Sequence, residues 1–396
     1  MTHIWRDSSL YLSRPKVDYV KEQTLLQSEQ KDVDTTPGQI TNERTLGILI
    51  LLTVPLAWGT YTPVVKYMYD RMDPSVPGFV FSAGYYLVAA AVLSGLNWFS
   101  TRNDESGDDV MQDETNASTI GGLELGSYLF LGNGFQVVGL QTVPADRAAF
   151  LVQLTTVMVP LVSAWVSGRG STSVPLMTWL SCIIAFAGVI IMGMDDNGQS
   201  AQMLSPDHLD WNGIISSIQI SQGDGLIILA ALAYTMHVVR LGVYAPKTRP
   251  LTLAASKART EAIFSVVLVM ALTLAASFRT TPEFVQQLGR EISTYFETMQ
   301  SMLRDNDSAI ATSSSVLISA ILWTGMITSA YTIYAQSFGQ RRINPVDSNL
   351  IYTTQPLFSS LFAYGLLGEQ LGLSGWVGAA LIGLALGLVA FGKEAE

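Results

Sequence analysis

Charge, cysteine and histidine are all scarce in this chain. Only 14% of its 396 residues are charged, whereas an ordinary soluble domain carries roughly a quarter. The single cysteine, Cys182, excludes a disulfide within the chain and any metal site built from several cysteines. The three histidines, His3, His208 and His237, are too few for a histidine-rich metal site. We therefore expect neither a metal nor a cofactor.

Basic patches are also lacking. The net charge is −10 and comes mainly from two acidic connections, 104–114 and 195–210. A protein that binds nucleic acid gathers Lys and Arg on one surface to neutralise phosphates, so we expect no nucleic-acid partner. Residues 1–43 are polar and contain no apolar core, so we expect neither a secretory signal nor a transit peptide in this segment.

Long apolar stretches make up most of the sequence after residue 45. Ten stretches contain no Asp, Glu, Lys or Arg: 46–65, 74–101, 125–145, 148–168, 170–194, 225–239, 262–278, 309–340, 348–368 and 370–392. A hydrocarbon core of ~30 Å needs ~20 helical residues. The two short stretches reach this length if Arg240 lies at a helix end and if the seventh helix begins near Leu253. The stretches are rich in Leu, Ala, Gly and Val and do not alternate with polar residues, which favours helices over a β-barrel. The sequence predicts an all-α integral membrane protein with ten transmembrane helices in a lipid bilayer.

The two halves of the chain resemble each other in three short motifs. Pro144-Ala145-Asp146 corresponds to Pro345-Val346-Asp347, Leu56-Ala57-Trp58 to Leu232-Ala233-Tyr234, and Trp179 to Trp376. Because each half has five predicted crossings, the second half must enter the membrane from the opposite side, as in the inverted repeats of secondary transporters. We predict a polar tail (1–45), a first five-helix repeat (46–194), an acidic loop (195–223) and a second five-helix repeat (224–392).

Basic residues predict the orientation. With the amino terminus taken as cytoplasmic, the cytoplasmic loops and tails carry fifteen Lys and Arg residues and the other loops six. The positive-inside tendency therefore places both termini on the cytoplasmic side. The sequence does not indicate which membrane contains the protein.

Several motifs carry a family resemblance. Residues 139–151 and 157–161, together with 56–59, 355–358, 368–371 and 375–379, resemble the helix signatures of EamA-type carriers in the drug/metabolite transporter superfamily. The resemblance covers roughly 46–392. It implies a carrier of ten helices in two repeats that works by alternating access, and it does not name a substrate. The chain departs from the family pattern at Thr156, where a proline is usual, at Gly168-Arg169, where Gly-Glu is frequent, and in its long connection 279–314.

Polar and aromatic side chains within the predicted helices are candidates for a central substrate cavity. On the sixth helix, Tyr234 and His237 share one face, which Arg240 borders. The alternative for each residue is packing, because amides and hydroxyls also join membrane helices to one another. The candidates are Trp58, Tyr61, Asn133, Gln136, Gln153, Tyr234, His237, Arg240, Tyr331, Gln336, Tyr352 and Gln355.

Carboxylates are expected only near the helix ends. Asp146 and Asp347 open the fourth and ninth helices, where capping and the helix dipole account for them. Glu124, Glu261 and Glu369 also lie near ends, which leaves no carboxylate in the middle of a span. His237 is then the one candidate proton carrier at mid-membrane, and facilitated diffusion or exchange is at least as well supported as proton coupling.

Two further segments have distinct patterns. Apolar residues in 283–304 recur at three- and four-residue spacing, which predicts an amphipathic helix that lies along the non-cytoplasmic interface or caps the cavity mouth. In the tenth helix, Gly383 and Gly387 form a GxxxG motif. Close packing within the chain is the expected use of this motif, and a homodimer face is the alternative.

These observations favour a multi-pass transporter of small organic metabolites, such as amino acid- or nucleobase-like solutes, over an enzyme. A carrier of phosphorylated sugars or nucleotide sugars needs a Lys or Arg in the central cavity to bind phosphate, and Arg240 is the only such residue among the cavity candidates. A membrane-embedded enzyme lacks a recognisable catalytic motif in the spans. A channel fits two inverted halves less well than a carrier that rocks between two states.

Overall fold

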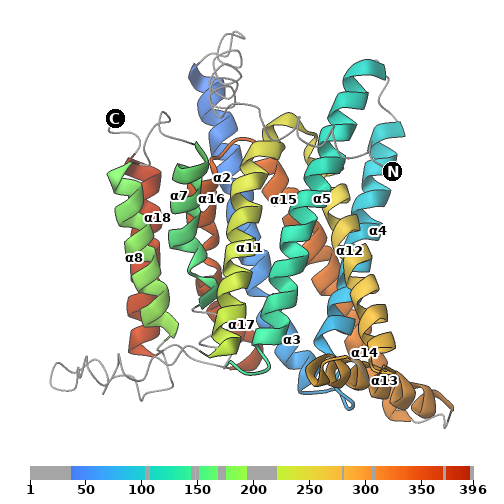
Figure 1. Ribbon diagram of the computed structural model, residues 1–396. Helices are drawn as coiled ribbons and strands as arrows, with labels where there is room; N and C mark the ends of the chain where they lie inside the picture. Colours follow the sequence, from blue (N-terminus) through green and yellow to red (C-terminus); the bar gives the residue numbers. More distant parts are fainter. Residues whose placement is uncertain are drawn as a thin grey trace, which may run out of the picture.

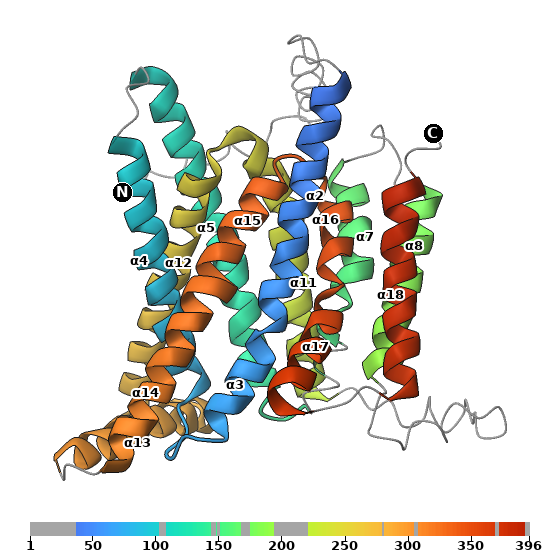
Figure 2. The same cartoon turned by 180° about the vertical axis from the view of Figure 1, so that it is seen from behind.

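The structure is a computed structural model that describes residues 37–102, 108–143, 148, 151–167, 175–193, 221–278, 281–304, 308–368 and 372–392. Within these ranges all regular secondary structure is helical, as the sequence predicts (Figure 1). Most of the helices run side by side in one bundle, and α13 lies across one end of it (Figures 1 and 2). The predicted acidic loop 195–223 falls almost wholly outside the described residues.

The first half of the chain supplies six described helices: α2 (Pro37–Gly59), α3 (Tyr61–Tyr69), α4 (Gly78–Arg102), α5 (Asp108–Gly139), α7 (Thr155–Ser167) and α8 (Leu176–Gly193). The second half supplies α11 (Gln222–Tyr244), the 3-10 turn η3 (Ala245–Lys247), α12 (Pro250–Ala275), α13 (Glu283–Arg304), α14 (Ser308–Trp323), the π-helix η4 (Thr324–Tyr331), α15 (Thr332–Gly339), α16 (Pro345–Tyr352), α17 (Gln355–Leu367) and α18 (Leu373–Gly392).

Five helical segments of the described chain are long and apolar enough to cross a membrane: Asn42–Tyr69, Gly78–Arg102, Gln222–Lys247, Pro250–Ala275 and Ser313–Gly339. Three shorter helical segments are also apolar: Thr155–Val166, Leu176–Ile191 and Leu373–Leu388. Helix α5 and the α16–α17 pair run alongside them in the bundle (Figures 1 and 2). The chain is therefore an integral, multi-pass membrane protein.

Helix α12 corrects one expectation from the sequence. It begins at Pro250, so Lys257, Arg259 and Glu261 belong to a membrane-length helix and not to a loop or a helix end. Charged residues are tolerated there when they face the interior of the bundle. Lys257 is fully buried and Glu261 is 1% exposed, so neither side chain meets lipid.

Contacts between helices mostly join the first half of the chain to the second. Helix α5 packs on α11 and α12, α2 packs on α15, α4 packs on η4 and α12, and α8 packs on α18. Small residues permit the close approach of α5: a Cβ atom at Gly126 would lie 2.6 Å from Thr260, and one at Gly132 would lie 2.5 Å from the ring of Tyr234. The two halves are therefore interleaved rather than separate.

Several helices are interrupted midway. Helix α2 gives way to α3 at Thr60, while α7 begins at Thr155 and α17 at Gln355. Asn344, and not Asp347, is the N-cap of α16: its side chain accepts a hydrogen bond from the backbone N–H of Asp347 at 2.9 Å. Asp347 lies within the first turn, where a carboxylate suits the helix dipole, and Asp146 lies outside the described residues.

The predicted amphipathic helix is present as α13. Leu288 and Ile292 are buried and pack with Phe79 of α4 and Leu272 of α12. The helix lies at the end of the bundle opposite to that where α2 begins and α18 ends (Figures 1 and 2).

The GxxxG pair of α18 does not pack closely within the described part of the chain. A Cβ atom at Gly383 or Gly387 would meet nothing within 4 Å. Close contact with α8 comes instead through Gly188, where a Cβ atom would lie 2.9 Å from the carbonyl oxygen of Gly378. The expected packing role of this pair is therefore wrong among the described residues, because Gly383 and Gly387 face away from α8.

Candidate functional site

A cavity of about 330 Å³ lies between the two halves of the bundle. Its wall draws on both halves of the chain, from α2 to α7 and from α11 to α17. Of the twelve cavity candidates predicted from the sequence, ten line it: Trp58, Tyr61, Asn133, Gln136, Gln153, Tyr234, His237, Gln336, Tyr352 and Gln355. A volume of this size is at the lower end of the range for small-molecule sites.

The wall made by α4, α5 and α11 is held by hydrogen bonds between side chains. The hydroxyl of Tyr234 donates to Oε1 of Gln136 at 2.8 Å. Asn133 joins α5 to α4, since its Nδ2 donates to Oγ of Ser82 at 3.1 Å while its Oδ1 accepts from Tyr85 at 3.4 Å. These bonds fix the side chains that face the cavity.

Helices α2 and α16 contribute an aromatic pair to the wall. Trp58 on α2 packs edge-on against Tyr352 on α16, with ring centroids 5.4 Å apart. The Tyr352 hydroxyl accepts a hydrogen bond from Nε2 of Gln340 at 3.3 Å. An aromatic ring and an oriented hydroxyl can each contact a solute with an apolar body and a polar end.

The π-helix η4 shapes a third part of the wall. Thr324, Thr328 and Ser329 lie within η4, and all three line the cavity. A π-helix changes which side chains share a face, and such segments are frequent at functional sites. Here the segment turns a row of hydroxyls toward the centre.

The interrupted helices bring amides to the cavity. Gln153 precedes α7 and Gln355 begins α17, and both line the cavity together with Thr155. Asn349 donates from Nδ2 to the carbonyl oxygen of Thr155 at 3.2 Å and so holds the start of α7 against α16. Broken helices at mid-membrane expose backbone groups that transporters use to bind solutes.

His237 on α11 and Lys257 and Glu261 on α12 are buried ionisable residues. Nζ of Lys257 is 3.4 Å from Nε2 of His237, and Glu261 lines the cavity one helical turn after Lys257. The expectation that no carboxylate lies in the middle of a span is therefore wrong. The physical reason is that Glu261 faces the cavity, where a charge avoids lipid.

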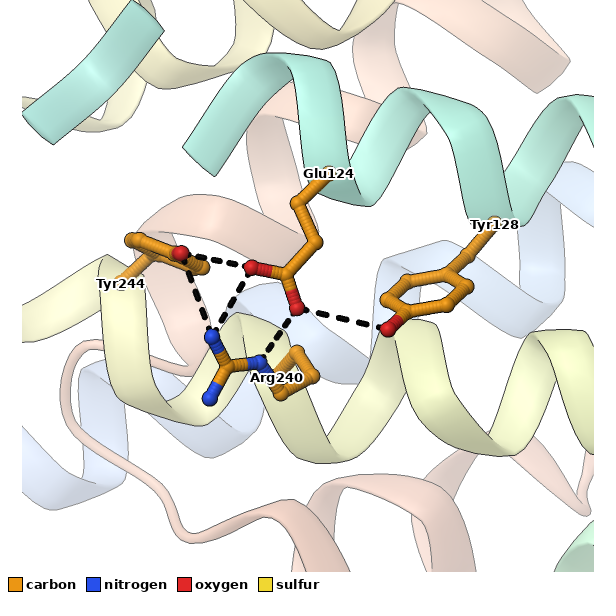
Figure 3. Close-up of polar contacts among 4 residues, drawn as sticks. All are labelled: Glu124, Tyr128, Arg240 and Tyr244. Carbon is orange, nitrogen blue, oxygen red and sulfur yellow. Dashed lines mark hydrogen bonds and ion pairs between the residues drawn. The ribbon is translucent and has the colours of Figure 1, made fainter. Parts of the chain in front are cut away.

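Two candidates lie outside the cavity lining. Arg240 pairs instead with Glu124: its Nη2 donates to Oε2 at 2.8 Å, and the Tyr244 hydroxyl donates to the same oxygen at 2.6 Å (Figure 3). Figure 3 shows Tyr128 completing this cluster from α5. Tyr331 is 39% exposed and its hydroxyl lies 2.6 Å from Oγ1 of Thr53 on α2.

Sequence reasoning missed four prominent lining residues: Tyr85, Tyr86, Asn349 and Glu261. Tyr85 and Tyr86 lie in an aromatic, charge-free run that gives no sign of which face is inward. For Glu261, the four-residue spacing from Lys257 was the available signal, because that spacing puts both charges on one helix face.

Comparison with known proteins places the chain among transporters. Residues 45–194 match the family described as EamA-like transporter family, and this segment nearly coincides with the predicted first repeat. The permease-like protein YdzE of Bacillus subtilis (strain 168) is 32% identical over 75 residues, which are 19% of this chain and 96% of that protein. A solved crystal structure aligns with 87% of this chain and 96% of its own chain, with a TM-score of 0.59 and 15% identity. At that identity the likeness to the crystal structure concerns the fold alone.

Proposed function

Because the chain belongs to the EamA-like transporter family, we propose that it carries small organic metabolites across a membrane by alternating access. The chain is thus a membrane transporter of the drug/metabolite type. The central cavity supports the transport of small organic metabolites most directly, because both halves of the chain line it with amides, hydroxyls and aromatic rings. Such a wall suits amino acid- or nucleobase-like solutes, which combine hydrogen-bonding groups with a flat or apolar body.

We further propose that the two halves are inverted five-helix repeats, which makes ten crossings in all. Residues at corresponding places in the two halves line the same cavity: Trp58 and Tyr234, which end the motifs Leu-Ala-Trp and Leu-Ala-Tyr, and Gln136 and Gln336, which precede Gly139 and Gly339 by three residues. The helix contacts are reciprocal in the same way. Helix α5 packs on α11 as α15 packs on α2, and α5 packs on α12 as η4 packs on α4. A two-fold axis in the membrane plane produces this pattern.

The ion pairs support alternating access. The three among the described residues are Arg240–Glu124, Arg249–Glu114 and Arg342–Glu43. Each joins the first half of the chain to the second. Glu43 and Glu114 lie near the starts of α2 and α5, Arg240 near the end of α11, Arg249 directly before α12 and Arg342 shortly after α15. These helix ends all lie at the end of the bundle where α2 begins and α18 ends (Figure 1). Contacts that tie the halves together at one end are those that must break when the cavity opens there.

Solute counterflow into proteoliposomes tests the proposal. Vesicles that contain the full chain are loaded with one unlabelled metabolite and given the same metabolite labelled outside, across a panel of amino acids, nucleobases and their amines. A carrier accumulates label transiently and saturates, whereas a channel only equilibrates it. Absence of counterflow for every solute on the panel would contradict the proposed function.

The alternative of a phosphorylated-sugar or nucleotide-sugar carrier ranks lower. It requires a cation in the cavity wall, but Arg240 pairs with Glu124 and Lys257 does not line the cavity. Sugar phosphates on the counterflow panel test this alternative directly.

Orientation and assembly belong to the same proposal. Without Lys257 and Arg259, which belong to α12, the predicted cytoplasmic loops and tails carry thirteen Lys and Arg residues against six elsewhere. The positive-inside tendency therefore still favours the cytoplasmic side for the end where α2 begins and the other side for α13. We propose that the face of α18 with Gly383 and Gly387 forms a homodimer contact, because the same face of a second copy can approach it closely.

A further inference from the structure

Glu261 is a carboxylate in the cavity wall, and one of its two oxygen atoms has no hydrogen-bond partner. It is 1% exposed and belongs to the cavity wall. Its Oε1 atom has no hydrogen-bond partner, and none of the three ion pairs of the described chain includes it. A buried polar atom in this condition is destabilising unless something else satisfies it.

Lys257, the nearest cation along α12, forms no ion pair with the Glu261 carboxylate among the described residues. Lys257 lies one turn away on α12, but its ammonium contacts Nε2 of His237 at 3.4 Å on α11. Lys257 is fully buried and is absent from the cavity wall. Lys257 therefore does not separate the Glu261 carboxylate from the cavity.

The surroundings of Glu261 suit an organic cation. Tyr85 and Tyr86 on α4 and Tyr234 on α11 line the same cavity as Glu261. Aromatic faces attract ammonium groups, and a carboxylate forms charge-assisted hydrogen bonds with them. A bare metal ion would need several oxygen or nitrogen ligands together, and the described residues hold no cluster of His, Cys, Asp and Glu that supplies them.

We propose that Glu261 binds the ammonium group of the transported solute, so that the solute is a compact amine or an amino acid. This assignment rests on the proposed carrier function and names its substrate class. The carboxylate and the tyrosines hold the ammonium end, and the amides of Gln136, Gln153 and Gln355 face the rest of the molecule.

The test is equilibrium binding of two labelled probes, phenethylamine and phenylalanine, to the purified full chain in nanodiscs. The neutral isostere 2-phenylethanol and the anion 3-phenylpropionate serve as competitors. We expect at least one ammonium probe to bind and 2-phenylethanol to compete weakly. Binding of phenethylamine alone identifies a free amine as the substrate class, and binding of phenylalanine identifies an amino acid.

Variants localise the site. Glu261→Gln should weaken binding of the ammonium probe by about tenfold or more and should change competition by 2-phenylethanol less than about twofold. Glu261→Asp keeps the charge but withdraws it by one methylene, so it should weaken binding by several-fold and retain the preference for ammonium. Glu291→Gln, the same change at an exposed position of α13, should bind as the parent does.

Two results would overturn the assignment. One is a parent protein that shows counterflow of other solutes but binds neither ammonium probe, in which case the carrier proposal stands and the role of Glu261 fails. The other is ammonium binding that is unchanged in both Glu261 variants. Glu261→Asp decides the question if Glu261→Gln does not fold. Failure of all counterflow is a separate result and removes the carrier proposal itself.

Discussion

At the scale of single residues, two cavity amides are the sharpest test of solute contact. Gln153 and Gln355 line the cavity and neither belongs to the side-chain hydrogen bonds within the described chain. Replacing either by Ala therefore removes no internal bond. We expect Gln153→Ala and Gln355→Ala each to weaken solute affinity by about three- to tenfold, the value of one hydrogen bond, and to leave the melting temperature unchanged.

The measurement is the half-saturation concentration of counterflow, followed by thermal unfolding of the same samples. Gln300→Ala on the exposed face of α13 is the control, since its side chain also makes no hydrogen bond within the described chain. A lower melting temperature with unaltered affinity would show that these amides serve packing instead.

Which cavity residues the sequence reveals depends on their surroundings. Gln136, Gln153, Gln336 and Gln355 stand out because an amide is unusual in a charge-free apolar run. Charge-free runs delimit the predicted helices and so put Glu261 at a helix end. A buried charge within a helix breaks such a run, so this criterion hides the charged residues that face a cavity.

At the scale of helices, the three ion pairs predict a state that is closed at one end. The side chains of each pair are partly exposed; those of Arg240 and Glu124, for example, are 26% and 25% exposed. Because solvent screens such pairs, each stabilises the closed state by only about 0.5 kcal/mol. Together they shift the balance between two states by about tenfold. The triple variant Glu43→Gln, Glu114→Gln, Glu124→Gln should open the cavity more often at that end.

Cysteine accessibility measures this opening. In a Cys182→Ser background, Leu129→Cys places a thiol in the cavity wall. We expect a membrane-impermeant reagent, supplied from the end that carries the ion pairs, to label it several-fold faster in the triple variant. The control changes Glu283, Glu291 and Glu297 of α13 to Gln, since all three are exposed. Equal labelling rates in both triples would mean that the ion pairs do not close the cavity.

Helix α13 gives a second prediction at this scale. Ile292 is 1% exposed and packs with Phe79, Leu272 and Leu288. Truncation of a well-packed apolar side chain costs about 2–5 kcal/mol, so Ile292→Ala should release α13 from the bundle. Limited proteolysis within α13 should become faster, while Phe296→Ala, at a position 49% exposed, should have little effect. Equal proteolysis rates would contradict the packing role of Ile292.

The elements differ in how far the sequence predicts them. The boundaries of α13 were predicted because it is amphipathic, and three- to four-residue periodicity is visible without any knowledge of its neighbours. The breaks before α7 and α17 and the π-helix η4 were not predicted. For α17 a local signal exists, since Pro356 stands in its first turn, where proline is common. The start of α7 is held by a tertiary contact, the hydrogen bond from Asn349 to the carbonyl oxygen of Thr155, which no local pattern encodes.

At the scale of the whole molecule, inverted repeats require an even number of crossings. The start of α2 and the end of α18 lie at one end of the bundle, and α13 lies at the other (Figures 1 and 2). Sequence motifs alone suggested this symmetry, and the reciprocal contacts of α5 and α15 now support it. The arrangement predicts which residues share a side of the membrane.

Single cysteines in the Cys182→Ser background test that prediction in right-side-out and inside-out vesicles. Arg44→Cys and Glu396→Cys should react with an impermeant maleimide only in inside-out vesicles, because the positive-inside tendency places both ends in the cytoplasm. Glu297→Cys on α13 should react only in right-side-out vesicles. If positions 44 and 396 are labelled from opposite sides, the number of crossings is odd. A two-fold axis in the membrane plane is then impossible, and the cavity between the halves has no symmetric pair of states to alternate between.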